Sequence, residues 1–357
     1  MEKPILPKTV TQVVKLYDPR TWREKGLWWT AGLFVVTYLL VITILAIFWS
    51  RSPETFDVRE KAATLAGGDG GDGSDAARLV TGTYTTAAAI GIAETLLNKP
   101  GGYLSNDMTP PGVFLDNIPN WEFGALTELR DLSRAMRNEF SRSQTQSIED
   151  KDLQVAEPQF SYDSESWILP STESEYRTGV RAMDRYFARL RDDKTSDGQF
   201  FARSDNLRSY LAVVEKRLGS LAQRLSYAVG QAQLDLALAG DPSARQARPS
   251  GGETENKTPW LEIDDVFFEA RGYTWALLHT LQALSIDFEP VLTGKNALVS
   301  LKQIIRELEN TQNPVWSPMI LNGTGFGPIG NHSLVMASYI SRANAAIIDL
   351  RSLLEKG

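Results

Sequence analysis

The chain has 357 residues, of which 42% are apolar and 23% charged, and its formal net charge at pH 7 is −7. This composition is that of a folded protein, and the absence of cysteine excludes disulfides, zinc–thiolate centres and iron–sulfur ligation by this chain. Only two histidines are present, so we expect neither a metal site nor a cofactor.

Residues 27–49 are the first predicted element, a transmembrane helix. Between Lys25 and Arg51 lie 25 residues without a charge, whereas about 20 suffice to cross the hydrocarbon core of a bilayer. Tryptophans stand at both ends of the segment, as expected for rings that settle at headgroup level. A buried core helix is the alternative, but such a helix is rarely this long and apolar on every face.

The charges that flank the predicted span indicate its orientation. Residues 1–26 form a basic tail with six Lys or Arg, whereas the three basic residues that closely follow the span are interleaved with acidic ones. The positive-inside rule therefore places the tail in the cytoplasm and the rest of the chain in the periplasm of a bacterial inner membrane. A cleavable signal peptide would have a shorter apolar region and a small-x-small exit, whereas residues 46–49 are bulky. We expect the helix to remain as an anchor.

The exported part is acidic. Residues 1–51 carry seven basic and three acidic side chains, a net charge of +4, which leaves −11 for the remainder. Electrostatics therefore gives this part no reason to bind nucleic acid or an anionic membrane surface.

Residues 50–77 are predicted to be a flexible linker. They include the tract GGDGGDGSD at 67–75, which resembles one turn of a calcium-binding nonapeptide repeat. Such folds need several stacked copies, so the linker interpretation is favoured.

Residues 78–357 are predicted to form an all-α domain, an elongated helical bundle. Helical periodicity covers 78–97, 121–146, 173–192, 205–236, 260–286, 296–312 and 332–355, and no segment shows the alternation of a half-buried strand. In 205–236 the apolar positions alternate steps of four and three: Leu207, Leu211, Val214, Leu218, Leu221, Leu225, Ala228 and Ala232. Residues 240–258 are rich in Gly, Pro and polar residues and predict a mobile loop.

A glycine motif precedes the last predicted helix. Gly325, Gly327 and Gly330 spell G-x-G-x-x-G, the fingerprint of a dinucleotide-binding turn. That site also needs a second strand with an acidic residue about twenty positions on, whereas the 27 residues after Gly330 predict one helix. A structural turn is favoured, with Asn331 or Ser333 capping the helix, although a glycine-lined helix start can also hold an anion.

Four segments resemble a domain-of-unknown-function family of single-pass inner-membrane proteins from proteobacteria. They are SNDMTPPGVFLDNIPNWEFG at 105–124, DLSRAMRNEFSRSQTQS at 131–147, WLEIDDVFFEARG at 260–272 and the stretch 315–351. The resemblance runs over nearly the whole chain and implies a membrane location with a helical periplasmic domain. It implies no catalytic or ligand-binding residues.

The loop before the helix predicted at 121–146 is a candidate partner surface. Asp116 favours a turn, after which Trp121 begins the helix. Phe114, Leu115, Ile118 and Trp121 then either pack on the bundle as a cap or line a groove, and the packed cap is favoured.

Two further places are candidates for chemistry. Glu262, Asp265 and Glu269 are three and four residues apart, which puts three carboxylates on one helix face that could bind a cation or hold a general acid. A solvated face neutralised by Arg271 or by arginines of neighbouring helices is favoured. His332 could donate to an anion or act as a base, although a capping or packed role is favoured.

The sequence therefore favours a non-enzymatic, membrane-anchored periplasmic scaffold or adaptor of the cell envelope with an envelope protein as partner, and it is compatible with a homo-oligomer. The alternative is a periplasmic hydrolase or ligand-binding domain that uses the carboxylates at 262–269 with the turn near His332. A pocket that joins Glu262, Asp265 or Glu269 to His332 would favour the enzyme, and an exposed apolar groove would favour the adaptor.

Overall fold

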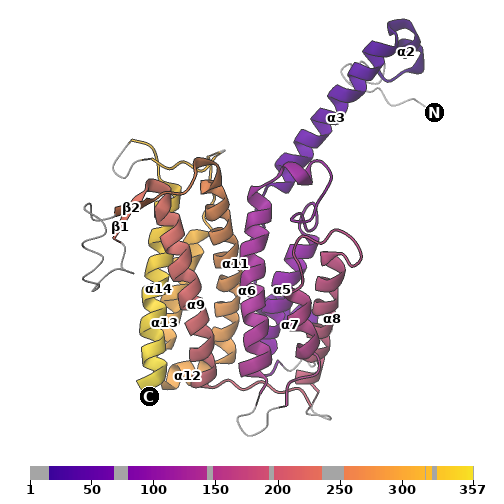
Figure 1. Cartoon of the computed structure of the whole chain (residues 1–357). Helices are drawn as coiled ribbons and strands as arrows, with labels where there is room; N and C mark the ends of the chain where they lie inside the picture. The colour runs from indigo at the N-terminus through magenta and orange to yellow at the C-terminus, as the bar shows by residue number, and fades with distance from the viewer. Residues whose placement is uncertain are drawn as a thin grey trace, which may run out of the picture.

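The computed structural model describes residues 16–67, 79–142, 148–192, 197–234, 253–317, 319–323 and 328–356. The predicted all-α fold is confirmed, because the domain is a bundle of helices that run up and down (Figure 1). Its helices are α4 (Val58–Leu65), α5 (Thr83–Asn98), α6 (Asn117–Ala135), α7 (Leu153–Phe160), α8 (Thr172–Leu190), α9 (Ser204–Ser226), α11 (Ile263–Asp287), α12 (Glu289–Gly294), α13 (Leu298–Thr311) and α14 (His332–Lys356). A π-helical turn, Met136–Phe140, extends α6.

The N-terminal helix α3 (Leu27–Trp49) stands apart from the bundle, preceded by the short α2 (Pro19–Lys25). It has 23 residues, none of them buried, and is long and apolar enough for a membrane span or a signal sequence. It joins the bundle at the end where α6, α11 and α14 begin (Figure 1). We call this the proximal end and the opposite one the distal end.

Helices α6 and α11 lie at the centre of the bundle and touch through two glycines. A Cβ atom at Gly124 would lie 2.0 Å from the carbonyl oxygen of Glu269, and one at Gly272 would lie 1.9 Å from that of Trp121. Any side chain at either position would therefore push the two backbones apart. The core continues on one side with α9, α13 and α14, and on the other with α4, α5, α7 and α8.

Helix α9 carries the predicted row of apolar positions, which we call the seam, but the helix is shorter than expected. The leucines and the valine of the seam, from Leu207 to Leu225, are buried, as is Ala228. The helix ends at Ser226, a 3₁₀ turn follows, and Gly230 has a positive φ of 75°, which takes the chain out of the helix. Ala232 lies in β1 (Gln231–Leu234), which pairs antiparallel with β2 (Glu253–Asn256). The predicted helix over 205–236 was too long. Ala228 and Ala232 match the apolar spacing of a helix, but an alanine at such a position does not by itself require the helix to continue.

The predicted linker is ordered where the structure describes it. Asp57 caps α4 by accepting hydrogen bonds from the backbone N–H groups of Arg59 and Glu60, and Val58 and Ala62 are buried. Of the predicted linker at 50–77, residues 58–65 are therefore helical, and their few apolar side chains pack on the bundle. Most of the tract at 67–75 lies outside the described residues, as do residues 240–252 of the predicted loop.

Candidate functional site

Two predicted site residues lie at the start of α6. The carboxylate of Asp116 accepts a hydrogen bond of 2.8 Å from the backbone N–H of Asn117, so it caps the helix. Trp121 is fully buried, and its ring centroid lies 5.0 Å from that of Trp275. The packed cap is present for Ile118 and Trp121, whereas Phe114 points to solvent with 73% of its surface exposed.

The three predicted carboxylates have different partners. Glu262 is exposed in the 3₁₀ turn before α11. Asp265 accepts a hydrogen bond of 2.7 Å from the Asn120 amide, and burial together with neighbouring carboxylates raises its pKa. Glu269 forms a two-pronged ion pair with Arg224 of α9, with N–O distances of 2.6 and 2.5 Å. An arginine of a neighbouring helix thus neutralises Glu269, as one alternative predicted.

His332 and Asn331 hold the start of α14. The Asn331 side-chain oxygen accepts a hydrogen bond of 3.0 Å from the N–H of Leu334, so Asn331 is the cap, and its amide nitrogen donates to the carbonyl of Gly323. His332 Nδ1 accepts a hydrogen bond of 2.9 Å from the backbone N–H of Leu321. The side chains of Asn331 and His332 therefore both make hydrogen bonds that stabilise this turn. Gly325 and Gly327 of the glycine motif lie outside the described residues.

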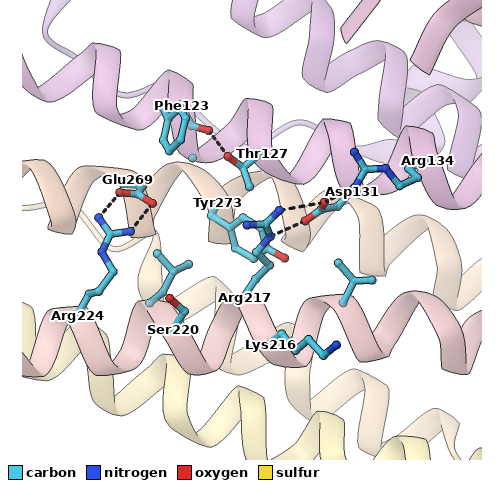
Figure 2. A pocket seen from close by; sticks show the side chains of 13 residues that line it. Phe123, Thr127, Asp131, Arg134, Lys216, Arg217, Ser220, Arg224, Glu269 and Tyr273 are labelled. Carbon is cyan, nitrogen blue, oxygen red and sulfur yellow. Dashed lines mark hydrogen bonds and ion pairs between the residues drawn. The ribbon is translucent and has the colours of Figure 1, made fainter. Parts of the chain in front are cut away.

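Glu269 lines a polar cavity of about 430 Å³ between α6, α9 and α11 (Figure 2). Two ion pairs cross it: Arg224 with Glu269, and Arg217 with Asp131, whose closest N–O distance is 2.8 Å. Arg134 and Lys216 add two further cations, so the lining carries four positive and two negative charges.

Tyr273 forms the inner wall of the polar cavity, and behind it lies a buried acid that sequence reasoning missed. Glu128 is fully buried and accepts a hydrogen bond from the hydroxyl of Tyr210. Burial raises the Glu128 pKa to about 8, so this carboxyl is mainly protonated at neutral pH. In the sequence, the only signal for this buried acid is that Glu128 lies three residues before Asp131 in α6. The sequence does not reveal which helix covers the face of α6 that carries Glu128.

His332 and Asn331 line a second hollow, an apolar groove of about 430 Å³ between α11, α13 and α14. Its apolar lining consists of Phe267, Pro314, Val315, Trp316, Val335, Met336 and Tyr339. Trp316 stands on the rim with 93% of its surface exposed, more than any other large apolar side chain described. The polar cavity and the apolar groove thus hold Glu269 and His332 separately, so the structure does not bring them into one site.

A buried cation closes the floor of the apolar groove. Arg271 donates hydrogen bonds to the carbonyls of Gln312 and Asn313, both at 2.9 Å, and to that of Thr311 at 3.3 Å. The bonds to Thr311 and Gln312 satisfy carbonyls at the C-terminal end of α13, and the bond to Asn313 holds the chain that follows it. Burial lowers the Arg271 pKa to about 10, and no carboxylate within the described ranges pairs with it. In the part of the chain that the structure describes, backbone oxygens alone offset its charge.

Comparison with known proteins gives one match. A family model described as "Uncharacterized protein conserved in bacteria (DUF2333)" matches residues 22–357. No curated protein and no solved structure matches the chain.

Proposed function

Because the chain belongs to this bacterial family, we propose that it is a single-pass inner-membrane protein whose periplasmic domain is a non-enzymatic scaffold or adaptor. The length and apolar surface of α3 support the anchor, and the six basic residues before it support a cytoplasmic amino terminus. Retention of α3 is supported by its last residue, Trp49, which packs against the domain core. A domain on the periplasmic side then has envelope proteins as its neighbours.

The observation that carries the adaptor function is the apolar groove. Exposed apolar hollows with an aromatic side chain on the rim are typical of protein-binding surfaces, where one or two large anchors supply most of the binding energy. Here Trp316 is the exposed aromatic, and Val335 and Tyr339 line the wall that α14 contributes. The buried charge of Arg271 at the floor adds a preference for an acidic group. The partner segment is therefore apolar with one carboxylate.

The distribution of titratable groups supports an adaptor over a hydrolase. A general acid or base must reach the reacting atoms together with its partners. Glu269 is engaged by Arg224 in the polar cavity, whereas His332 is engaged by the backbone of Leu321 beside the apolar groove. The carboxylates and the histidine therefore have no common substrate position.

Site-specific photocrosslinking in living cells tests the adaptor function. A photoreactive amino acid replaces Val335 in the groove or, as a matched control, Val299, which is equally apolar and 79% exposed at the distal end. We expect a discrete adduct with another envelope protein from position 335 and none from 299. Identical adducts from both positions, or an adduct made only of two copies of this chain, would contradict the proposal.

The polar cavity supports a second candidate, the binding of a small anion. Its four cations exceed its two carboxylates, and Lys216 is exposed at its mouth. Thermal unfolding with added citrate or pyrophosphate would test it. We expect a rise in Tm that Lys216→Glu reduces, whereas equal shifts in both proteins would show general salt effects.

A further inference from the structure

Three loops at the proximal end expose large apolar side chains. They are Val113 and Phe114 before α6, Trp167 to Leu169 before α8, and Trp260 and Leu261 before α11. Leu169 is 89% exposed and Leu261 77%. Among the described residues outside α3 and outside the apolar groove, the large apolar side chains that are at least half exposed all lie at the proximal end except Ile148 and Val299. An end that faced only water would rarely gather so many.

The connection from α3 holds this end close to the membrane. The ring of Trp49, the last residue of α3, lies 2.8 Å from where a Cβ of Gly101 would be, in the loop after α5. Seven residues further on, Phe56 is fixed to α11 by a hydrogen bond between its backbone N–H and His279. The connection between the predicted span and the domain is therefore short and attached to the domain at both of its ends. Because tryptophans at span ends lie at headgroup depth, the loop after α5 lies at that depth as well.

Hydrogen bonds hold two of the exposed loops in one rigid surface. The side-chain amide of Asn106 donates to the carbonyl of Ser166 and to the carboxylate of Glu173, both at 3.0 Å. The loop that carries Phe114 is thereby fixed to the one that carries Leu169. The apolar side chains are thus presented together rather than on independent loops.

We propose that these three loops rest in the lipid bilayer interface, so that the domain is docked on the membrane that anchors it. The inference depends on α3 being a membrane anchor, as proposed above. Trp, Phe and Leu side chains are suited to the boundary between headgroups and acyl chains. The exposed acids Asp163 and Glu165 beside Trp167 oppose attraction to anionic lipid. The lipid partner is therefore the apolar interface of a zwitterionic bilayer.

Depth-dependent fluorescence quenching on the full chain tests the inference. The chain has no cysteine, so Phe114→Cys, Leu169→Cys and the distal control Val299→Cys can each carry a single environment-sensitive dye. The labelled proteins are reconstituted in phosphatidylcholine vesicles that contain nitroxide-labelled lipid. We expect lipid quenching of at least twofold at positions 114 and 169, with weak quenching by aqueous iodide, and the reverse at 299. Iodide quenching at 114 and 169 equal to that at 299 would overturn the inference, and so would shielding from both quenchers, which indicates a protein contact.

Extraction of the same vesicles with alkaline carbonate separates the two claims. Retention of the chain without lipid quenching at 114 and 169 would overturn the docked orientation and leave the anchor standing. Release of the chain would overturn the anchor and the docking with it.

Discussion

The backbone N–H of Phe56 donates a hydrogen bond of 3.0 Å to Nε2 of His279, and the two rings stack with centroids 3.9 Å apart. His279 Nδ1 donates to the carbonyl of Trp275 at 2.7 Å, which leaves Nε2 free to accept. Burial lowers the His279 pKa to about 4, so the ring is neutral at physiological pH. Two residues that lie 223 positions apart in the sequence thus attach the segment after α3 to the central helix.

Removing the Phe56 ring should loosen this attachment. We expect Phe56→Ala to lower the free energy of unfolding by about 2 kcal/mol, less than for a fully buried phenylalanine because the ring is half-buried. Urea denaturation of the full chain in detergent measures it, with Val299→Ala at an exposed site as control. A loss no larger than that of the control would mean that the segment is not docked.

The close contact of α6 with α11 predicts that one methyl group added between the two helices strongly lowers the stability of the fold. We expect Gly272→Ala to lower the free energy of unfolding by about 3 kcal/mol or more, because its Cβ would meet the backbone of Trp121. Gly294→Ala is the matched control, since a Cβ there meets nothing within 4 Å. Thermal unfolding compares the two, and equal Tm values would contradict the helix contact.

Glu128 predicts a specific pH dependence. Its pKa is raised to about 8 in the folded protein from a usual value of 4.5, so the folded state keeps a proton that the unfolded state releases. Stability from this group is present below pH 4.5 and is lost as the pH rises towards 8, by at most about 1.4 kcal/mol per pH unit.

Glu128→Gln removes this slope. We expect the stability of the variant relative to the unmodified chain to increase between pH 5.5 and 8, as measured by urea denaturation. The opposite slope from His279, whose lowered pKa costs stability as the pH falls from 6.5, is common to both proteins and cancels. Glu262→Gln, at an exposed carboxylate of the same chain, is the control for the chemical substitution. A pH-independent difference for Glu128→Gln would show that Glu128 is ionised in the folded state.

The proposed topology predicts the location of the C-terminus. A reporter enzyme fused after Gly357 should be active if it requires the periplasm and inactive if it requires the cytoplasm. Activity of a cytoplasm-dependent reporter would reverse the proposed orientation and remove periplasmic proteins as partners.

The parts of the fold that depend on local pattern could be predicted from the sequence. The uninterrupted apolar run of α3, the periodic seam of α9 and the cap that Asn331 provides each depend on residues within one segment. Contacts between distant segments could not be predicted. Phe56 occurs in a polar stretch that predicts a linker, and its place on α11 depends on the three-dimensional position of His279.

The candidate sites show the same limit. The spacing of Glu262, Asp265 and Glu269 predicts a shared helix face, but Arg224 and Asn120, which engage two of them, come from other helices. The apolar groove is formed by three helices and is absent from any single pattern. Trp316 lies in the stretch 315–351 that resembles the family, but its exposure could not be predicted, because an exposed tryptophan and a buried one look alike in a sequence.

The most direct test of the adaptor function is whether the crosslink from the groove depends on Trp316. This side chain is almost fully exposed, so Trp316→Ala should leave the fold and the Tm unchanged while removing the main apolar anchor. In cells that carry the photoreactive group at position 335, we expect this substitution to reduce the adduct with the envelope partner at least tenfold. An adduct of unchanged yield in the Trp316→Ala protein would contradict binding through the groove.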